Sequence, residues 1–224
     1  MHKQMKLFIG LCIVVFLACQ GGKAKLKLDK DIFACGEEIA VTFTAPSNFT
    51  EHAWVGIIPS EVPHGSESQN DQHDIAYIYL DKQVAGVLNF YAPGKAGNYD
   101  FRMHDTDDDG KEVASVSFTV KVITEGAKLS LDKDTYAPGE EIRLNITAPA
   151  VFGSKAWIGI IPSDVPHGSE NENDQHDVSY QYLNKKTQAL LVFNAPEEPG
   201  TYDFRMHDTD DDGNEITYIE FTVK

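Results

Sequence analysis

Short stretches in which apolar and polar residues alternate run through the chain from about residue 24 to residue 224. The clearest are residues 128–132, 142–146 and 200–206. Residues 156–161 instead form a continuous apolar run, as a central strand would. A period of two is typical of strands that bury one face, and no helical period of useful length occurs. The pattern therefore predicts an all-β protein.

The stretches are short and regularly separated by turn residues, which narrows the fold class. In the C-terminal half the expected strands are residues 128–132, 142–146, 156–161, 178–183, 189–193, 200–206 and 215–223. Seven or so strands in about 98 residues are typical of an immunoglobulin-like antiparallel β-sandwich. In such a sandwich we expect Trp54 and Trp157 in the core, and tyrosine corners at Tyr99 and Tyr202.

The chain repeats itself without a gap at an offset of 103 residues. About 60 of the 98 aligned positions are identical, and FRMHDTDDDG occurs at 101–110 and again at 204–213. Only residues 122–126 join the copies. We therefore predict two tandem immunoglobulin-like domains, residues 24–121 and 127–224, each large enough for its own core.

The first 19 residues differ in character from the rest. Two lysines precede an apolar run at residues 7–17, which is too short for a resident membrane span and typical of an export signal. Phe-Leu-Ala-Cys then ends at Cys19 and is similar to the lipobox of bacterial lipoproteins, with Phe16 in the place of the usual leucine. Spirochaete-type lipoproteins tolerate this change. The resemblance implies a signal peptide over residues 1–19, lipidation of Cys19, and export to the outer membrane. An ordinary secretory signal is the alternative.

The net charge restricts the possible partners, and the cysteine content restricts how the domains can be stabilised. The formal net charge is −16, which argues against nucleic acid and favours cations or basic protein surfaces. Outside the signal the only cysteine is Cys35, so the domains must be stable without an internal disulfide.

The motifs PGEEI, WIGIIPS and GTYDFR run through the second copy and have close counterparts in the first. Together they resemble SKICH-like and related immunoglobulin-like modules, which occur as accessory domains of phosphatases and in bacterial surface proteins. Those modules commonly have aspartate before the tryptophan, where this chain has Ala53 and Ala156. The resemblance implies a binding or spacing module and transfers no catalytic residues.

Alternate acidic residues followed by glycine make the DTDDDG loop a candidate calcium site. A hard cation prefers oxygen ligands, and D-x-D-x-D-G is the first half of an EF-hand loop. The second half and the flanking helices are missing, so we expect a calcium loop in a β-hairpin, or only a solvated acidic turn. The candidate ligands are Asp105, Asp107, Asp109, Glu112, Asp208, Asp210, Asp212 and Glu215.

A second candidate loop lies between the third and fourth expected strands of each copy. Its imidazoles and carboxylates could bind a transition metal, although the spacing fits no standard zinc pattern. A compact loop whose histidines hydrogen-bond to backbone groups is the preferred alternative. The candidates are His64, Glu67, Asp71, His73, Asp74, His167, Glu170, Asp174, His176 and Asp177.

Strand order predicts that the two loops lie at opposite ends of the sandwich, unless the longer loop folds back. Alternation also predicts that Arg102, His104, Arg205 and His207 point away from the core. No nucleophile–base constellation is evident, because His-Gly-Ser alone is no triad.

We therefore expect a lipid-anchored, non-enzymatic envelope or surface protein that binds calcium and a host or envelope protein. A metal-dependent hydrolase and a purely structural spacer are the alternatives.

Overall fold

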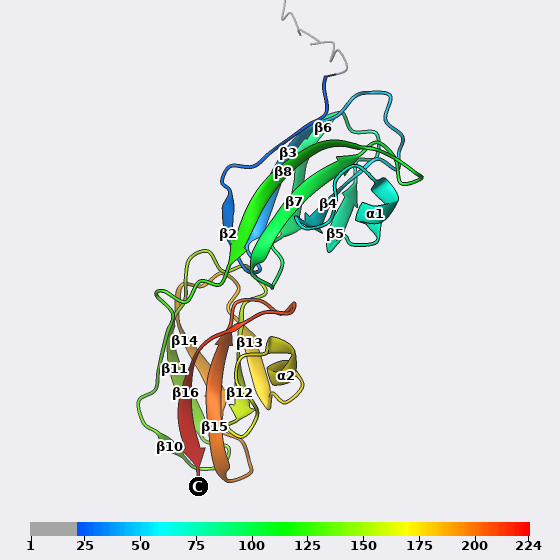
Figure 1. Cartoon of the computed structure of the whole chain (residues 1–224). Coiled ribbons are helices and arrows are strands. Elements are labelled where there is room, and N and C mark those ends of the chain that lie inside the picture. Colours follow the sequence, from blue (N-terminus) through cyan, green and yellow to red (C-terminus); the bar gives the residue numbers. More distant parts are fainter. Residues whose placement is uncertain (1–21) are drawn as a thin grey trace, which may run out of the picture.

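The computed structural model describes residues 22–224, so the expected signal peptide and Cys19 lie outside the described residues. Two domains follow one another end to end (Figure 1). In the first, the strands are β1 (Lys25–Lys27), β2 (Ile32–Ala34), β3 (Glu38–Thr44), β4 (Trp54–Pro59), β5 (Ala76–Tyr79), β6 (Ala85–Tyr91), β7 (Gly97–His104) and β8 (Glu112–Lys121), and the helix is α1 (Glu67–Asp71).

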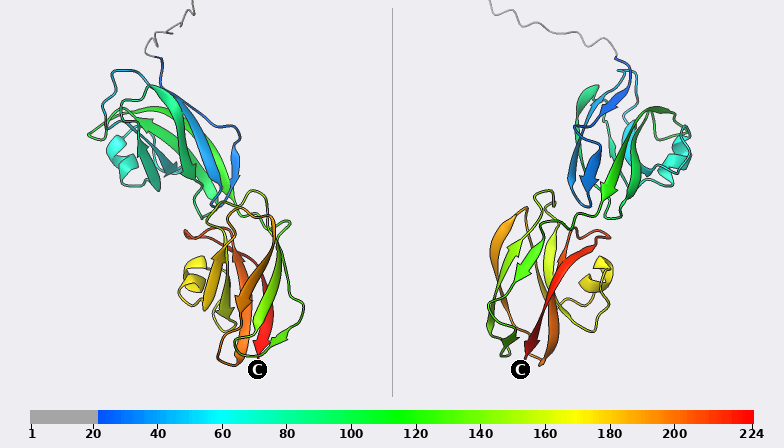
Figure 2. Two further views of the ribbon diagram at one scale, coloured as in Figure 1. Left: turned by 180° about the vertical axis from the view of Figure 1, so that it is seen from behind. Right: turned by 60° about the vertical axis from the view of Figure 1, so that its left-hand side comes forward.

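The second domain repeats this order. Its strands are β9 (Lys128–Ser130), β10 (Thr135–Tyr136), β11 (Glu141–Thr147), β12 (Trp157–Pro162), β13 (Ser179–Tyr182), β14 (Gln188–Asn194), β15 (Gly200–His207) and β16 (Glu215–Val223), and its helix is α2 (Glu170–Asp174). The two short helices lie on the same side of the molecule in all views (Figures 1 and 2). No helix among residues 22–224 is long and apolar enough to cross a membrane.

Each domain is a sandwich of a three-stranded and a five-stranded sheet. The orders are β1-β3-β6 and β2-β8-β7-β4-β5 in the first domain, with the equivalent strands in the second. Neighbouring strands are antiparallel except that β2 runs parallel to β8, and β10 to β16. This order confirms the predicted all-β, immunoglobulin-like sandwich.

The core lies between the sheets, as the alternation predicts. In β3 the side chains of Ile39, Val41 and Phe43 are buried, whereas the residues between them are exposed. They belong to one apolar cluster with Phe101 and Met103 of β7. The tyrosine corner is present as predicted, because the Tyr99 hydroxyl donates a hydrogen bond to the Lys95 carbonyl at 2.8 Å.

Trp54 is buried, as predicted, but it lies outside the main apolar cluster of the sandwich. It packs with Ile58 and Val62 in a separate cluster and stacks on His104, with ring centroids 4.4 Å apart. Trp157 repeats this arrangement with Ile161, Val165 and His207. The tryptophans lie on the outer face of the five-stranded sheet, where the loop after β4 and β12 covers them.

Candidate functional site

The long loop after β4 folds back along the outer face of the five-stranded sheet. At the end of this path, Ser66 forms an isolated β-bridge with Lys111, the residue that follows the acidic loop. Ser66 then caps α1, its hydroxyl accepting the Gln69 N–H at 3.3 Å. The longer loop thus folds back, which is the exception that the sequence-based prediction allows, and the two candidate loops lie side by side instead of at opposite ends of the sandwich.

Arg102 is the physical reason for this return path. Its guanidinium donates hydrogen bonds to the carbonyls of Val62 (2.8 Å) and Pro63 (3.1 Å) and to Asn70 Oδ1 (2.6 Å). It also pairs with Asp100 at 2.8 Å, and both charged side chains are almost fully buried. Arg205 makes the same contacts with Val165, Pro166, Asn173 and Asp203. Arg102 and Arg205 therefore point away from the core, as predicted, but they are buried under the long loop.

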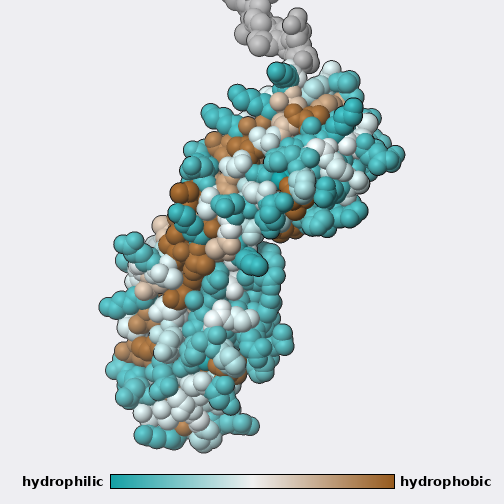
Figure 3. Space-filling view, in the orientation of Figure 1, coloured by the Kyte–Doolittle hydropathy of each residue, from teal (hydrophilic) through white to brown (hydrophobic). Residues whose placement is uncertain are grey.

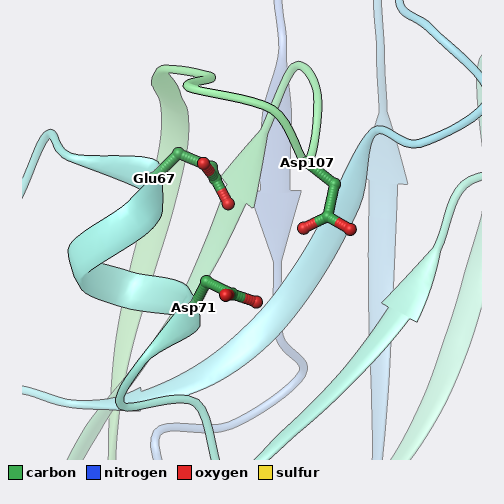
Figure 4. Close-up of side chains that lie close together, drawn as sticks. All are labelled: Glu67, Asp71 and Asp107. Carbon is green, nitrogen blue, oxygen red and sulfur yellow. The ribbon is translucent and has the colours of Figure 1, made fainter.

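The returned loop brings three carboxylates together, two from the long loop and one from the acidic loop. Oxygens of Glu67, Asp71 and Asp107 lie within 4.8 Å of one another, and the side chains point toward a common space (Figure 4). The second domain has the same group in Glu170, Asp174 and Asp210. We call each group the carboxylate triad.

The triads carry uncompensated negative charge. Among residues 22–224, no basic side chain lies within 4.0 Å of any of the six carboxylates. Glu67 is only 4% exposed, and burial, followed by the charges of Asp107 and Asp71, raises the pKa of its carboxyl. Burial and Asp210 raise the pKa of Glu170 to about 7. A group of this kind favours uptake of a cation or a proton.

One tyrosine contacts each triad from the neighbouring edge strand. The Tyr79 hydroxyl donates a hydrogen bond to Asp107, and Tyr182 does the same to Asp210. This bond raises the pKa of Tyr79 and leaves the phenol as a donor that orients the carboxylate. The ring of Tyr77, half exposed, packs edge-on against Tyr79 with centroids 5.3 Å apart.

The other predicted calcium ligands do not join the triad. Asp105 caps its own loop, because its Oδ1 accepts the Lys111 N–H at 2.8 Å. Asp109 takes a left-handed backbone (φ 52°), and a Cβ on Gly110 would lie 2.3 Å from the Thr106 carbonyl. Glu112 binds the long loop instead. The corresponding residues Asp208, Asp212 and Glu215 are also outside their triad.

The histidines of the long loop make local hydrogen bonds. His64 pairs through Nδ1 with Glu112 at 2.7 Å, and His73 Nδ1 donates to the Gln69 carbonyl at 2.8 Å. His167 and His176 repeat these bonds with Glu215 and Glu172. Asp74 and Asp177 are half-buried beside the triads, and burial raises the pKa of both carboxyls. His73 and His176 thus hydrogen-bond to backbone groups, as the compact-loop alternative expects, whereas His64 and His167 bond to glutamate side chains.

Sequence reasoning placed Arg102 on the outer face but missed its role under the long loop, and it did not single out Asn70 or Tyr79, which also build the triad's surroundings. The available signal was a charged Asp-x-Arg pair on a strand next to a long loop, present in both copies. Charges at these positions need a polar cover when the sheet face is buried, and the long loop provides it.

No protein-family model matches the chain, and neither does any curated protein sequence. Among solved structures, purple acid phosphatase from yellow lupin (Lupinus luteus) seeds is similar at 11% identity and TM-score 0.40, over 90% of this chain and 40% of that one. The adhesin InvE of Yersinia pseudotuberculosis is similar at 10% identity and TM-score 0.34, over 90% and 59%. The FN1–FN3 domains of chicken CNTN1 are similar at 9% identity and TM-score 0.34, over 89% of this chain and 64% of that one. This chain thus spans less than two thirds of each of these structures.

Proposed function

We propose that this protein is an exported, lipid-anchored and non-enzymatic binding module in which each domain holds one calcium ion. The observation that carries the proposal is the carboxylate triad, which draws oxygen ligands from two separate loops and has no basic counter-charge. Calcium takes six to eight oxygen ligands, so three carboxylates and water form a suitable set. All-oxygen ligation also favours a hard cation over zinc, which prefers nitrogen and sulfur.

The contacts give no support to hydrolysis by a serine nucleophile. The Ser66 hydroxyl caps α1, while the nearby His64 imidazole is held by Glu112. A general base must lie within hydrogen-bond reach of its nucleophile, and no serine–histidine hydrogen bond occurs among residues 22–224. Binding is therefore the activity we propose.

The membrane and protein partners belong to the same proposal. Lipidation at Cys19 would tether the first domain to the outer membrane, through six residues that reach at most about 20 Å when extended. The acidic surface suits a host or envelope protein with basic patches and disfavours nucleic acid.

The calcium proposal is tested by calorimetric titration of residues 20–224, the mature chain without its lipidated Cys19, which is the mature chain used in the experiments below. We expect two sites per chain, with Kd in the range of about 10⁻⁴–10⁻³ M that is typical of extracellular modules. Asp71→Asn should remove one of the two sites. Asp109→Asn is the matched control, because Asp109 lies in the same acidic region but outside the triad, and should leave both sites. Loss of binding in the control, or two sites in Asp71→Asn, contradicts the proposal.

A further inference from the structure

The two domains meet through opposite poles. The pole of the first domain contains Cys35, Gly36 and Gly94, and the second domain presents its acidic loop, residues 208–214. Figure 1 shows this loop reaching the lower end of the first domain, and Figure 3 shows hydrophobic side chains gathered between the domains. We call this contact the junction.

Polar side chains connect the domains around the junction. Asn214 Nδ2 donates to the Gly94 carbonyl at 2.9 Å, and Lys185 pairs with Glu38 at 2.7 Å. The Tyr91 and Ser154 hydroxyls are 3.3 Å apart. These contacts join segments far apart in the sequence.

The backbones approach so closely that only glycine fits at three positions. A Cβ on Gly94 would lie 2.1 Å from the Asp211 carbonyl oxygen, and one on Gly153 would lie 2.2 Å from the Gly36 carbonyl oxygen. A Cβ on Gly36 would lie 2.5 Å from the Thr209 side chain. A contact below 3.0 Å requires a neighbour to shift, and at Gly94 and Gly153 that neighbour is backbone of the other domain, so a side chain there pushes the domains apart.

The junction also changes the environment of one acidic loop but not the other. Asp208 and Thr209 are 1% and 2% exposed, whereas their counterparts Asp105 and Thr106 are only partly buried. Asp208 lies beside the fully buried Cys35 thiol, whose pKa burial raises to about 12. The two loops are identical in sequence over residues 105–110 and 208–213, so their different burial comes from docking alone.

The two outer poles of the molecule carry surfaces equivalent to the two that meet at the junction. The first domain ends in the identical, undocked acidic loop, and the second domain ends in a pole equivalent to the one that receives residues 208–214. A contact of this head-to-tail type would extend from chain to chain without closing.

Four substitutions between the copies fall at the docking positions. Glu197 stands at the position of Gly94, Thr50 at that of Gly153, Pro138 at that of Cys35, and Lys111 at that of Asn214. Glu197 and Thr50 place side chains where the junction has no room for a Cβ. Lys111 replaces the amide that donates to Gly94, and it brings a different shape and charge.

We propose that the junction surface fits one partner, the acidic loop of the chain's own second domain, and that these substitutions prevent the same docking between copies. The protein therefore has a fixed interdomain contact and remains monomeric, although it carries both halves of a polymerising interface. This inference does not depend on calcium binding.

The proposal is tested in the mature chain by sedimentation and by small-angle X-ray scattering. Thr50→Gly, Lys111→Asn and Glu197→Gly are combined in one variant, with Glu198→Gly as the control. We expect concentration-dependent head-to-tail chains in the triple variant, measured up to about 1 mM because a short linker gives the natural junction an effective concentration of that order. The wild type and the control should remain monomeric. Self-association of the wild type, or a triple variant that stays monomeric, overturns the proposal.

A second variant tests the junction within one chain. Gly94→Glu introduces the residue of the sister domain and should increase the maximum dimension and the spread of interdomain distances. Ala85→Glu adds the same charge to an exposed position at the far end of the first domain and should leave the scattering unchanged. Unchanged scattering for Gly94→Glu overturns the proposal, and circular dichroism confirms that both domains remain folded.

Discussion

His104 and His207 are fully buried, and neither ring nitrogen of either imidazole has a hydrogen-bond partner among residues 22–224. Burial lowers the pKa of His104 to about 4 and that of His207 to about 3. Arg102 also lowers the pKa of His104, whereas Glu112, Asp105 and Asp107 oppose the shift. Both histidines are therefore neutral in the folded protein near neutral pH.

The buried neutral histidines should make the folded protein less stable as the pH falls from about 6.5 to about 4. The unfolded chain takes up a proton at each histidine near pH 6.5, whereas the folded chain does so at His104 only near pH 4. The stabilising contribution of the neutral His104 is therefore complete above pH 6.5 and decreases as the pH falls toward 4. The maximum loss is roughly 3 kcal/mol for His104. His104→Gln should lessen the fall in Tm between pH 7 and pH 4.5 relative to wild type. The triad glutamates have raised pKa values, so their protonation stabilises the folded state as the pH falls. Comparing the variant with the wild type at each pH removes this contribution. Parallel curves for wild type and variant would refute this assignment.

At the scale of elements, the folded-back loop is the feature that builds the site. Alternation predicted the strands because a strand's face follows directly from its sequence. The path of residues 60–75 could not be predicted in the same way, since it depends on one arginine reaching the backbone carbonyls of Val62 and Pro63 across the sheet. Both loops were identified as candidates from sequence, but the triad takes one member from the acidic loop and two from the long loop.

Removing this arginine should therefore release the loop. We expect Arg102→Met to destabilise the first domain by about 3–5 kcal/mol, because Asp100 remains buried without its partner. Adding Asp100→Asn should recover part of the loss by removing the unpaired charge, and denaturant unfolding measures both. Calcium binding at the first site should weaken in both variants, since Glu67 and Asp71 lose their support. A double variant no more stable than Arg102→Met would contradict the buried-pair account.

At the scale of the whole molecule, the 103-residue offset predicted two domains of one fold. It could not predict their contact, because the junction depends on glycines at positions where the copies differ, such as Gly94 and Glu197. The proposed lipid anchor also belongs to this scale. The chain enters the first domain at one end, and its C-terminus lies at the far end of the second (Figure 1). A tether at Cys19 would therefore hold the first domain near the membrane and leave the second domain distant.

Lipidation is expected at Cys19 alone. Palmitate labelling should be lost in Cys19→Ala, and the variant should appear in the soluble periplasmic or extracellular fraction. Cys35→Ala tests the remaining mature cysteine and should keep the label, because its thiol is buried at the junction. Label that persists in Cys19→Ala would rule out the anchor.

The most direct test of the central claim is tyrosine-sensitised terbium luminescence of the mature chain. Terbium replaces calcium at oxygen sites, and the Tyr79 and Tyr182 rings are hydrogen-bonded to triad carboxylates, which places them beside the bound ion. We predict sensitised emission that calcium displaces, that falls to about half in Asp107→Asn, and that disappears in Asp107→Asn combined with Asp210→Asn, in line with oxygen ligation by the triads. Emission that is absent in the wild type, or unchanged in the double variant, would contradict the assignment of the triads as cation sites.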